Sequence, residues 1–260
     1  MLLQKQPKQQ KSSLASKNNI PIKKSWGQNF LTDDNTINKI ITIINPQKED
    51  TILEIGPGHG ALTEKLLTKC KKLHAVEIDP LLCKPLKEEY NEMKLFNEDI
   101  LKWKQPQINY NKIVGNIPYN ISSQIIFKFL NESWDSMILM LQKEMAKRIT
   151  SKEGSKGYGR ISVMVQNFCT VSYMCDISRN VFHPKPKVDS GILLFKRKKT
   201  SLDVNKFSLF IKEAFKQRRK KLKNNLKDFC NLEIIEKYAH KRPEEISPKE
   251  YLILFNKIYF

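Results

Sequence analysis

Cysteine pairs, clustered histidines and long apolar runs are all missing from this sequence of 260 residues. The 5 cysteines are an odd number without a C-x-x-C pair, which argues against a disulfide framework or a zinc site and fits a reducing compartment. The 4 histidines show no metal-ligand spacing, so no metal is expected. No apolar run approaches the roughly 20 residues that a membrane helix needs. Membrane insertion is therefore not expected. The expected location is the cytoplasm.

Acid is also scarce, because 27 Asp and Glu stand against 46 Lys and Arg, a formal net charge of +19. Such an excess favours a polyanionic partner, since neutralised phosphates release counterions and drive association. A merely solubilising surface is the alternative, and composition does not separate the two. The first 24 residues contain no acid and lack the apolar centre of a secretory signal. Residues 1–22 are predicted to be a flexible basic tail, with organellar import as the alternative.

Short apolar runs alternate with amphipathic stretches from residue 51 to residue 150. This rhythm predicts an α/β fold in which a parallel sheet is covered by helices on both faces. A helix with Asp33 or Asp34 at its cap, ended by Asn45-Pro46, precedes the sheet. Strands are expected at 51–55, 72–77, 93–97, 112–116 and 136–142, helices at 61–69, 80–90, 121–130, 144–150 and 161–168, and later β-like runs at 170–177 and 190–196.

The pattern changes near residue 200. From Leu202 onward no strand pattern remains, and the segments that look helical carry clustered charge, as in residues 216–223. The sequence therefore predicts, after the tail, a sheet domain over residues 23–199 and a small helical domain over residues 200–260.

The sharpest single motif is the glycine-rich run Glu54–Gly60, directly after the first expected strand and before a helix. Glycine lets the backbone turn tightly and approach a ligand without a Cβ clash, so Gly56, Gly58 and Gly60 are candidate cofactor residues. Such a turn also suits a dinucleotide oxidoreductase, but Glu54 would repel a pyrophosphate bound there. A carboxylate at this position instead suits a ligand with an amino group and a sulfonium.

Two further carboxylates follow the next two strands. Glu77 closes the second strand, where it could accept hydrogen bonds from two ribose hydroxyls. A helix cap is the alternative for Glu77, but Asp79 fills that role well. Asp99 follows the third strand and could accept from an adenine amine, with Ile78 and Ile100 on the two faces of the ring. A helix cap is the alternative here too. Asp99 alone does not decide between the two, but in series with Gly56 and Glu77 it favours cofactor binding.

The fourth strand ends in Asn116-Ile117-Pro118-Tyr119. An adenine amine is a poor nucleophile because its lone pair is delocalised into the ring. The Asn116 amide oxygen and the Pro118 carbonyl could hold the two amine hydrogens and aim the lone pair at a methyl group. Tyr119 offers a face for stacking the base. An ordinary strand-ending turn is the alternative, and the position one strand after Asp99 favours amine methylation.

In combination these motifs resemble the ribosomal RNA adenine dimethyltransferases, and the resemblance runs from Lys23 to the C-terminus. Its opening signature is Lys23–Leu31. Ile117 and Ser123 depart from the family pattern, in which Leu and Thr are usual. The other segments that carry the resemblance are 54–63, 77, 99, 116–119, 141–146, 158–163, 181–190, 214–222 and 242–247.

The resemblance implies a Rossmann-like S-adenosylmethionine methyltransferase. Family members dimethylate the N6 amines of two adjacent adenosines near the 3′ end of small-subunit (16S) rRNA. The expected partner is therefore that rRNA within an immature 30S-type particle, and a monomer is expected. Phe182 is placed against the target adenine opposite Tyr119; without the resemblance, a plugging hydrophobe is the better interpretation of Phe182. The residues implied at the cofactor are Gln28, Asn29, Leu31, Gly56, Glu77, Asp99 and Asn116.

Arg218, Arg219, Lys220 and Lys221 form a dense basic cluster in the second expected domain. On one helix these side chains would circle more than one face, so not all could meet the same RNA. A solvated charged helix is the alternative, but beside an RNA-methylating core the positioning of phosphates is favoured.

Two rival functions stay open. One is a related methyltransferase of a large-subunit rRNA adenine, of the macrolide-resistance type; the run 217–222 and the run 242–247 favour the small-subunit enzyme instead. The other is a non-catalytic RNA-binding assembly factor, which would not need the intact set Gly56, Glu77, Asp99 and Asn116.

Overall fold

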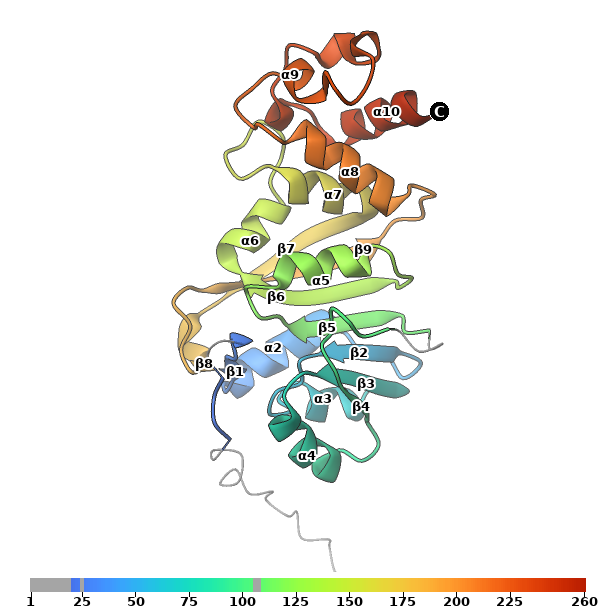
Figure 1. Ribbon diagram of the computed structural model, residues 1–260. Helices are drawn as coiled ribbons and strands as arrows, with labels where there is room; N and C mark the ends of the chain where they lie inside the picture. The colour runs from blue at the N-terminus through green and yellow to red at the C-terminus, as the bar shows by residue number, and fades with distance from the viewer. Residues whose placement is uncertain (1–19, 24–25, 105–108) are drawn as a thin grey trace, which may run out of the picture.

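The computed structural model describes residues 20–23, 26–104 and 109–260. All but the last three residues of the predicted tail lie outside this part. Figure 1 shows an elongated molecule, with the sheet in the N-terminal part and helices stacked at the C-terminal end. No helix in the described ranges is long and apolar enough to cross a membrane.

The central sheet has seven strands in the order β4-β3-β2-β5-β6-β9-β7. Strands β2, β3, β4, β5 and β6 pair with one another in parallel, as the sequence predicts, whereas β9 is antiparallel to both β6 and β7. The parallel sheet predicted for residues 51–142 is confirmed, and the two later β-like runs, whose direction the sequence did not predict, add an antiparallel edge. The run from β7 through residues 178–189 to β9 returns along the same edge, and antiparallel partners need no crossover helix. The strands are β2 (Thr51–Ile55), β3 (Lys72–Glu77), β4 (Lys94–Asn97), β5 (Lys112–Asn116), β6 (Ser136–Gln142), β7 (Cys169–Ile177) and β9 (Ser190–Arg197).

Apolar side chains alternate along the inner strands and bury both faces of the sheet. Leu53 and Ile113 pack in one cluster with the helices α5 and α7, while Ile52 and Val114 pack in a second cluster with α2. Burial on two faces explains why these strands are nearly continuous apolar runs. The predicted helical cover of both faces is confirmed. The helices around the sheet are α2 (Asp34–Ile44), α3 (Thr63–Leu67), α4 (Pro80–Glu89), α5 (Ser122–Phe129), α6 (Lys143–Ile149) and α7 (Arg160–Phe168).

Local capping chemistry fixes the helices beside the site. The Asp33 side chain accepts from the backbone N–H of Thr36 at the start of α2, and Asn45 ends that helix in the left-handed conformation, with φ 46°. Asp79 caps α4 by accepting from the N–H of Leu81. All three roles agree with the sequence prediction, because Asp side chains accept from free N–H groups at helix starts and Asn tolerates the left-handed backbone at a helix end.

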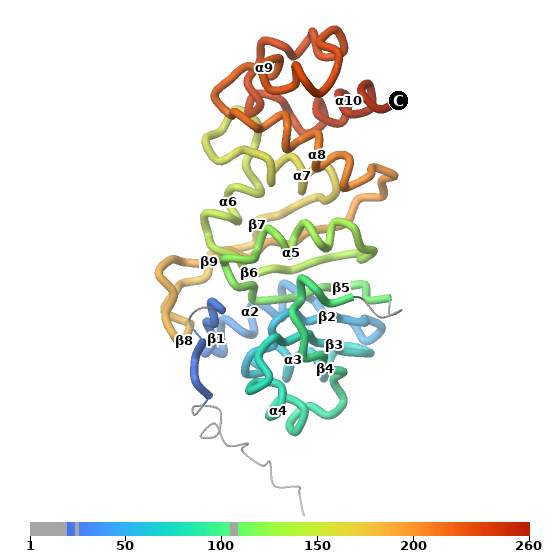
Figure 2. The backbone as a smooth tube through the Cα atoms, in the orientation of Figure 1, coloured from blue at the N-terminus to red at the C-terminus, as the bar shows by residue number. Residues whose placement is uncertain are grey.

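A two-residue ladder joins segments that are far apart in the chain. Strand β1 (Phe30–Leu31) pairs antiparallel with β8 (Phe182–His183), so that Leu31 lies opposite Phe182. Both strands lie together beside the carboxyl edge of the sheet (Figure 2). The sequence did not predict this ladder, since two residues are too short to show any periodicity.

The C-terminal region is helical and shares the core of the sheet region. Phe168 of α7 contacts Phe207 of α8 with ring centroids 5.9 Å apart, and both belong to one continuous hydrophobic cluster. The last strand ends at Arg197 and α8 begins at Val204; the domain boundary at residues 199/200 stays a prediction. The helical elements are α8 (Val204–Ala214), α9 (Leu222–Leu226) and α10 (Pro248–Tyr259), with short 3-10 turns at Leu232–Tyr238 and Pro243–Glu245.

The basic cluster 218–221 does not lie on a helix, so that expectation is wrong. It forms the turn between α8 and α9. The Asn225 amide group donates to the Ala214 carbonyl at 2.7 Å, and its oxygen accepts from the N–H of Gln217 at 3.2 Å. These bonds satisfy the backbone at the end of α8 and stop the helix before the cluster begins.

Candidate active site

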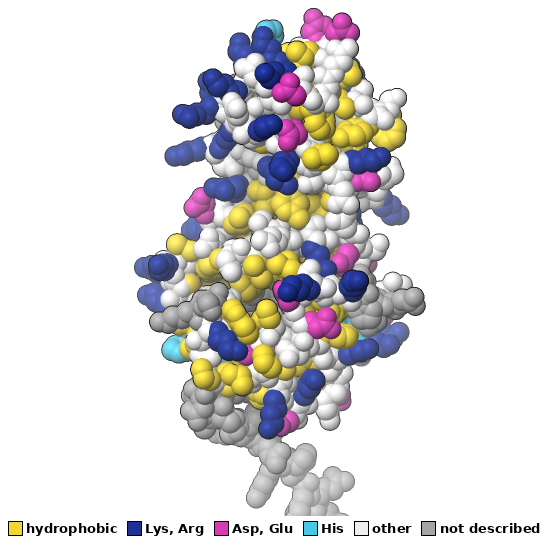
Figure 3. Space-filling model, in the orientation of Figure 1, with side chains coloured by type: hydrophobic (Ala, Val, Ile, Leu, Met, Phe, Trp, Pro, Cys, Tyr) yellow, Lys and Arg dark blue, Asp and Glu magenta, His cyan; other side chains and the backbone are white. Residues whose placement is uncertain are grey.

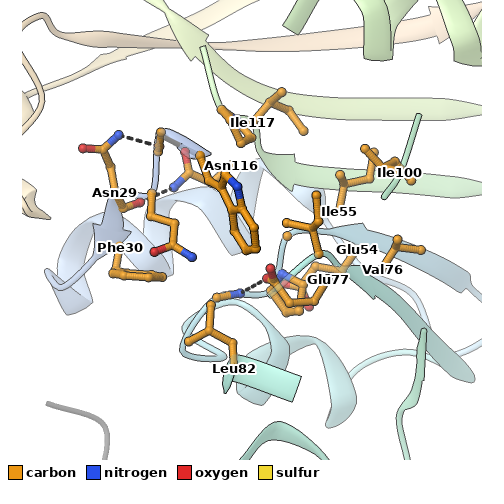
Figure 4. A pocket seen from close by; sticks show the side chains of 18 of the residues that line it. Asn29, Phe30, Glu54, Ile55, Val76, Glu77, Leu82, Ile100, Asn116 and Ile117 are labelled. Carbon is orange, nitrogen blue, oxygen red and sulfur yellow. Dashed lines mark hydrogen bonds between the residues drawn. The ribbon is translucent and has the colours of Figure 1, made fainter. Parts of the chain in front are cut away.

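A pocket opens at the carboxyl ends of β2, β3 and β5 (Figure 4). The strand order reverses between β2 and β5, and open α/β sheets bind ligands outside the strand ends at such a switch point. Residues 26–31, the N-terminal wall of the pocket, close one side. In Figure 4, Asn29 and Phe30 of this wall face Val76 and Ile100 across the pocket.

The glycine-rich turn after β2 forms the floor. Gly58 has φ +60°, and a Cβ there would lie 3.0 Å from the Phe30 ring. Gly60 has φ +84°, and a Cβ there would lie 2.6 Å from the Tyr90 ring. Both the left-handed backbone and the lack of space require glycine. The N–H of Gly56 donates to the Val76 carbonyl at 2.9 Å, which joins the turn to the end of β3.

Glu77 is buried at the end of β3, with 5 % of its surface exposed. Its carboxylate accepts from the N–H of Gly58 at 3.3 Å and from the N–H of Asp79 at 2.9 Å. Burial nevertheless raises the pKa of Glu77. Two carboxylate oxygens have about four acceptor positions, so lone pairs remain for a hydroxyl-bearing ligand.

Glu54 is the second buried acid of the pocket, 2 % exposed. Its one hydrogen bond from the described residues comes from the Thr63 hydroxyl at 2.7 Å. Burial raises the pKa of Glu54 to about 7, and the nearby Glu77 carboxylate adds to the rise. An arriving cationic group would favour the ionised form, because opposite charge offsets the cost of burial.

Asp99, Ile78 and Ile100 all line the pocket. Asp99 also accepts from the N–H of Leu101 at 2.9 Å, but this bond lies in a turn and no helix begins there, so the helix-cap alternative does not describe it. Ile100 is buried, whereas Ile78 is 44 % exposed. One apolar face is therefore preformed and the other is open to solvent.

Asn116 is oriented by the N-terminal wall. Its Nδ2 donates to the Asn29 backbone carbonyl at 2.8 Å, as Figure 4 shows. The Asn29 amide in turn donates to the Gly27 carbonyl at 2.8 Å. Asn116 lines the pocket, and because its nitrogen is engaged, Oδ1 remains as an acceptor to which no described residue bonds.

The other two residues of this motif are partly engaged within the protein. The Pro118 carbonyl accepts from the N–H of Ile121 at 3.2 Å and from the Ser122 hydroxyl at 3.1 Å. Its two lone pairs are in use, which leaves Asn116 as the better-placed acceptor for an amine. The Tyr119 hydroxyl lies 2.8 Å from that of Ser190, and its ring lines the pocket.

Phe182 and the basic cluster lie away from the pocket lining. Phe182 is 5 % exposed and packs with Leu31 in the second hydrophobic cluster, as a plugging hydrophobe would. Arg218 donates to the Lys156 carbonyl at 2.9 Å and is thus occupied by a neighbouring loop. Arg219, Lys220 and Lys221 are exposed.

Sequence reasoning did not single out three aromatic residues of the pocket: Trp26, Phe30 and His59. The Phe30 and His59 rings are 4.0 Å apart between centroids and connect the wall to the glycine-rich turn. Trp26 and Phe30 both belong to the signature 23–31. Their position next to predicted cofactor residues could have marked them as pocket residues.

The chain was compared with known proteins. A family model described as "Ribosomal RNA adenine dimethylase" matches residues 19–256. Curated relatives named "Ribosomal RNA small subunit methyltransferase A" are 40% identical in Malacoplasma penetrans, covering 92% of this chain and 93% of the relative, and 41% identical in Prosthecochloris aestuarii, covering 92% and 95%. A dimethyladenosine transferase from Plasmodium falciparum has a TM-score of 0.78 at 29% identity, covering 88% of this chain and 98% of that one. The 23S rRNA methyltransferase ErmE has a TM-score of 0.69 at 25% identity, covering 88% and 99%.

Proposed function

The chain belongs to the ribosomal RNA adenine dimethylase family, and from that premise we propose that it dimethylates the N6 amines of two adjacent adenosines near the 3′ end of small-subunit rRNA. It is an rRNA adenine dimethyltransferase that uses S-adenosylmethionine. The observation that carries the reaction is Asn116, which lines the pocket and whose nitrogen is fixed by the Asn29 carbonyl, so that its oxygen is left as an acceptor without a partner among the described residues.

The pocket residues fit S-adenosylmethionine, which supplies a methyl group bound to a sulfonium. Glu77 has acceptor positions left for a ribose diol, and its two backbone donors hold it in place. Glu54 is buried and accepts one hydrogen bond among the described residues, from Thr63, so it suits the positively charged amino group of S-adenosylmethionine. Asp99 and Ile100 would receive the adenine. Gln28, Asn29, Leu31 and the glycines would shape the remaining wall.

The chemistry asked of the protein is orientation rather than acid–base catalysis. Asn116 Oδ1 would accept one hydrogen of the target amine and disfavour its planar, delocalised form. The Tyr119 ring would hold the base, and the proton leaves to solvent once the nitrogen is cationic. A preorganised acceptor of this kind contributes because it needs no rearrangement during the reaction. The target base must first be unstacked into the pocket.

The RNA would reach the pocket along the basic side of the C-terminal region. Figure 3 shows Lys and Arg side chains gathered over that region at the upper left. Arg219, Lys220 and Lys221 are exposed in the α8–α9 turn and are assigned to phosphates, which position RNA without reading its sequence. Arg218 would act indirectly, by holding the loop that it bonds. The proposed partner is an immature 30S-type particle, bound by a monomer.

Likeness to a large-subunit enzyme makes 23S rRNA the second candidate substrate. The purified protein is incubated with labelled S-adenosylmethionine and separated ribosomal subunits from cells that lack it, and adenosines are analysed by mass spectrometry. Dimethyladenosine in small-subunit rRNA is expected, and the Asn116→Ala variant controls for contaminating activity. Label in large-subunit rRNA alone would overturn the proposal. Absence of S-adenosylmethionine binding by calorimetry would instead favour a non-catalytic assembly factor.

A further inference from the structure

Asp79 makes more contacts than a helix cap requires. Its side chain is 0% exposed. Besides the capping bond from the N–H of Leu81 at 3.1 Å, Oδ1 accepts from Lys23 Nζ at 2.8 Å and Oδ2 accepts from Gln28 Nε2 at 2.8 Å. Capping of α4 needs only the first of these bonds.

Both additional donors come from the segment that carries the N-terminal wall. Lys23 and Gln28 also bond each other, since the N–H of Lys23 donates to Gln28 Oε1 at 2.7 Å. The Lys23 ammonium lies 4.1 Å from the centre of the Trp26 ring, and Trp26 lines the pocket. The carboxylate of Asp79 therefore holds the segment from which the wall side chains project.

The opposite side of Asp79 contacts the pocket floor. Its backbone N–H donates to Glu77 Oε1 at 2.9 Å. Asp79 itself is not part of the pocket lining. Asp79 thus connects Gln28 of the N-terminal wall to Glu77 at the end of β3 without itself lining the pocket. Burial acts to raise the pKa of Asp79, but the bonds from Lys23 and Gln28 outweigh it and hold that pKa below its usual range.

We infer that Asp79 is a positioning residue that fixes the N-terminal wall against Glu77 and so completes the cofactor pocket. The inference rests on the proposed function, because it takes the ligand to be S-adenosylmethionine. A fully buried carboxylate is suited to this task even though the Lys23 side chain is 31% exposed, since Asp79 without a partner would be costly to keep buried. The wall consequently has one strongly favoured position.

The test uses the full-length protein and a double-mutant cycle. Asp79→Ser keeps an N-cap hydroxyl for α4 but removes the acceptor of Lys23, and Lys23→Met removes the charge from the other side. Asp203→Ser, at the N-cap of α8, is the matched control for capping alone. S-adenosylmethionine affinity is measured by calorimetry, and KM and kcat are measured for methyl transfer.

Asp79→Ser and Lys23→Met are each expected to weaken S-adenosylmethionine binding roughly tenfold, which corresponds to one charge-assisted contact. KM for the cofactor should rise while kcat at saturating cofactor stays near wild type. The double variant should be no weaker than the worse single variant, because both act through one bond. Asp203→Ser should leave the affinity unchanged.

Wild-type affinity in Lys23→Met, or additive effects in the double variant, would overturn the role of Asp79. Equal losses in Asp79→Ser and Asp203→Ser would also overturn it, since they would show a capping effect. Wild-type protein that binds no S-adenosylmethionine would refute the proposed function itself, which is a different result.

Discussion

Strand β2 has a buried carboxyl group at each end, and their surroundings differ. Asp50, just before the amino end, is 4% exposed and accepts from Lys112 Nζ, Asn111 Nδ2 and the N–H of Gln47, each at 2.6 Å. Glu54, near the carboxyl end, is as deeply buried but has the single bond from Thr63. Burial acts to raise both pKa values; the partners lower that of Asp50, whereas that of Glu54 stays raised.

The difference separates stability from ligand binding along one strand. A buried charge with all its partners present holds the fold together, and removing a partner leaves that charge costly. A buried acid without a full set of partners is poised for a ligand, and perturbed acids gather at functional sites for this reason. The amino edge of the sheet therefore supports the structure, and the carboxyl edge is the one we propose to bind the ligand.

Strand β5 repeats the comparison with two asparagines. Asn111, before its amino end, donates to Asp50 and accepts from the N–H of Thr51 at 2.9 Å, so both ends of its amide are engaged. Asn116, at its carboxyl end, has only its nitrogen engaged. The same residue type thus serves the fold at one edge, and at the other it has the free acceptor that the proposed reaction needs.

The largest expected effect comes from replacing each asparagine by alanine. Asn116→Ala should lower kcat for methyl transfer about 10³-fold, because one preorganised polar group is lost, with little change in unfolding free energy. Asn111→Ala should lower the unfolding free energy by about 2 kcal/mol, because Thr51 N–H and Asp50 lose a partner, with near-normal activity at 25 °C. Urea denaturation and initial rates measure both. If Asn111→Ala lost activity while staying folded, the division between the edges would be wrong.

The next effect is a pH dependence at Glu54. Its folded-state pKa is about 7, above the unfolded value, so the cofactor-free protein should lose stability as pH rises from about 4.5 through 7. Glu54→Gln keeps an acceptor for Thr63 but cannot ionise, and should be more stable than wild type at pH 8 by about 3 kcal/mol. Unfolding free energies of both proteins at several pH values test this. Parallel curves for the two proteins would show that Glu54 ionises normally in the fold.

A smaller effect, of opposite sign with pH, is expected at the other end of β2. Lys112→Met removes the cation beside Asp50 and should cost about 2 kcal/mol at pH 7, because the backbone and Asn111 bonds remain. The folded pKa of Asp50 is lowered, so its contribution is present above the unfolded pKa and is lost as pH falls through the folded value. The difference between variant and wild type should therefore shrink in acid. A difference that is constant down to pH 2 would exclude the ion pair as its source.

The sequence predicted most of the sheet region because its signals are local. Buried strands such as β2 are short apolar runs, and Asp33 and Asp79 are caps that can be read within a few residues. The fold class and the family were confirmed. The pocket also brings together the predicted glycine-rich turn, Glu77 and Asn116. The roles of these residues toward cofactor and base stay predictions.

What could not be predicted depends on partners that are distant in the chain. The β1–β8 ladder has two residues in each strand, so only tertiary contact defines it. The run 216–223 looks helical and carries clustered charge, but Asn225 bonds the end of α8 and residues 215–221 form a turn instead. Phe182 lies opposite Leu31 in that ladder and is absent from the pocket lining, and its role against the target base stays a prediction. Local periodicity carries no information about such contacts.

The smallest expected effect comes from removing the single hydrogen bond that Glu54 accepts from Thr63. Thr63 is 0% exposed, and its hydroxyl donates to Glu54 at 2.7 Å. In the wild type this bond lowers the pKa of Glu54 against the effect of burial. Thr63→Val keeps the side-chain shape but removes the bond, so the pKa of Glu54 should rise further. The pH at which the cofactor-free protein loses stability should therefore move upward, by an amount worth about 1 kcal/mol for one hydrogen bond. Asp50 and its pH dependence in acid should not change, because Thr63 is absent from its partners. A midpoint that does not move would mean that the hydroxyl bonds the protonated and ionised acid equally well, and that Glu54 is left to burial and the ligand alone.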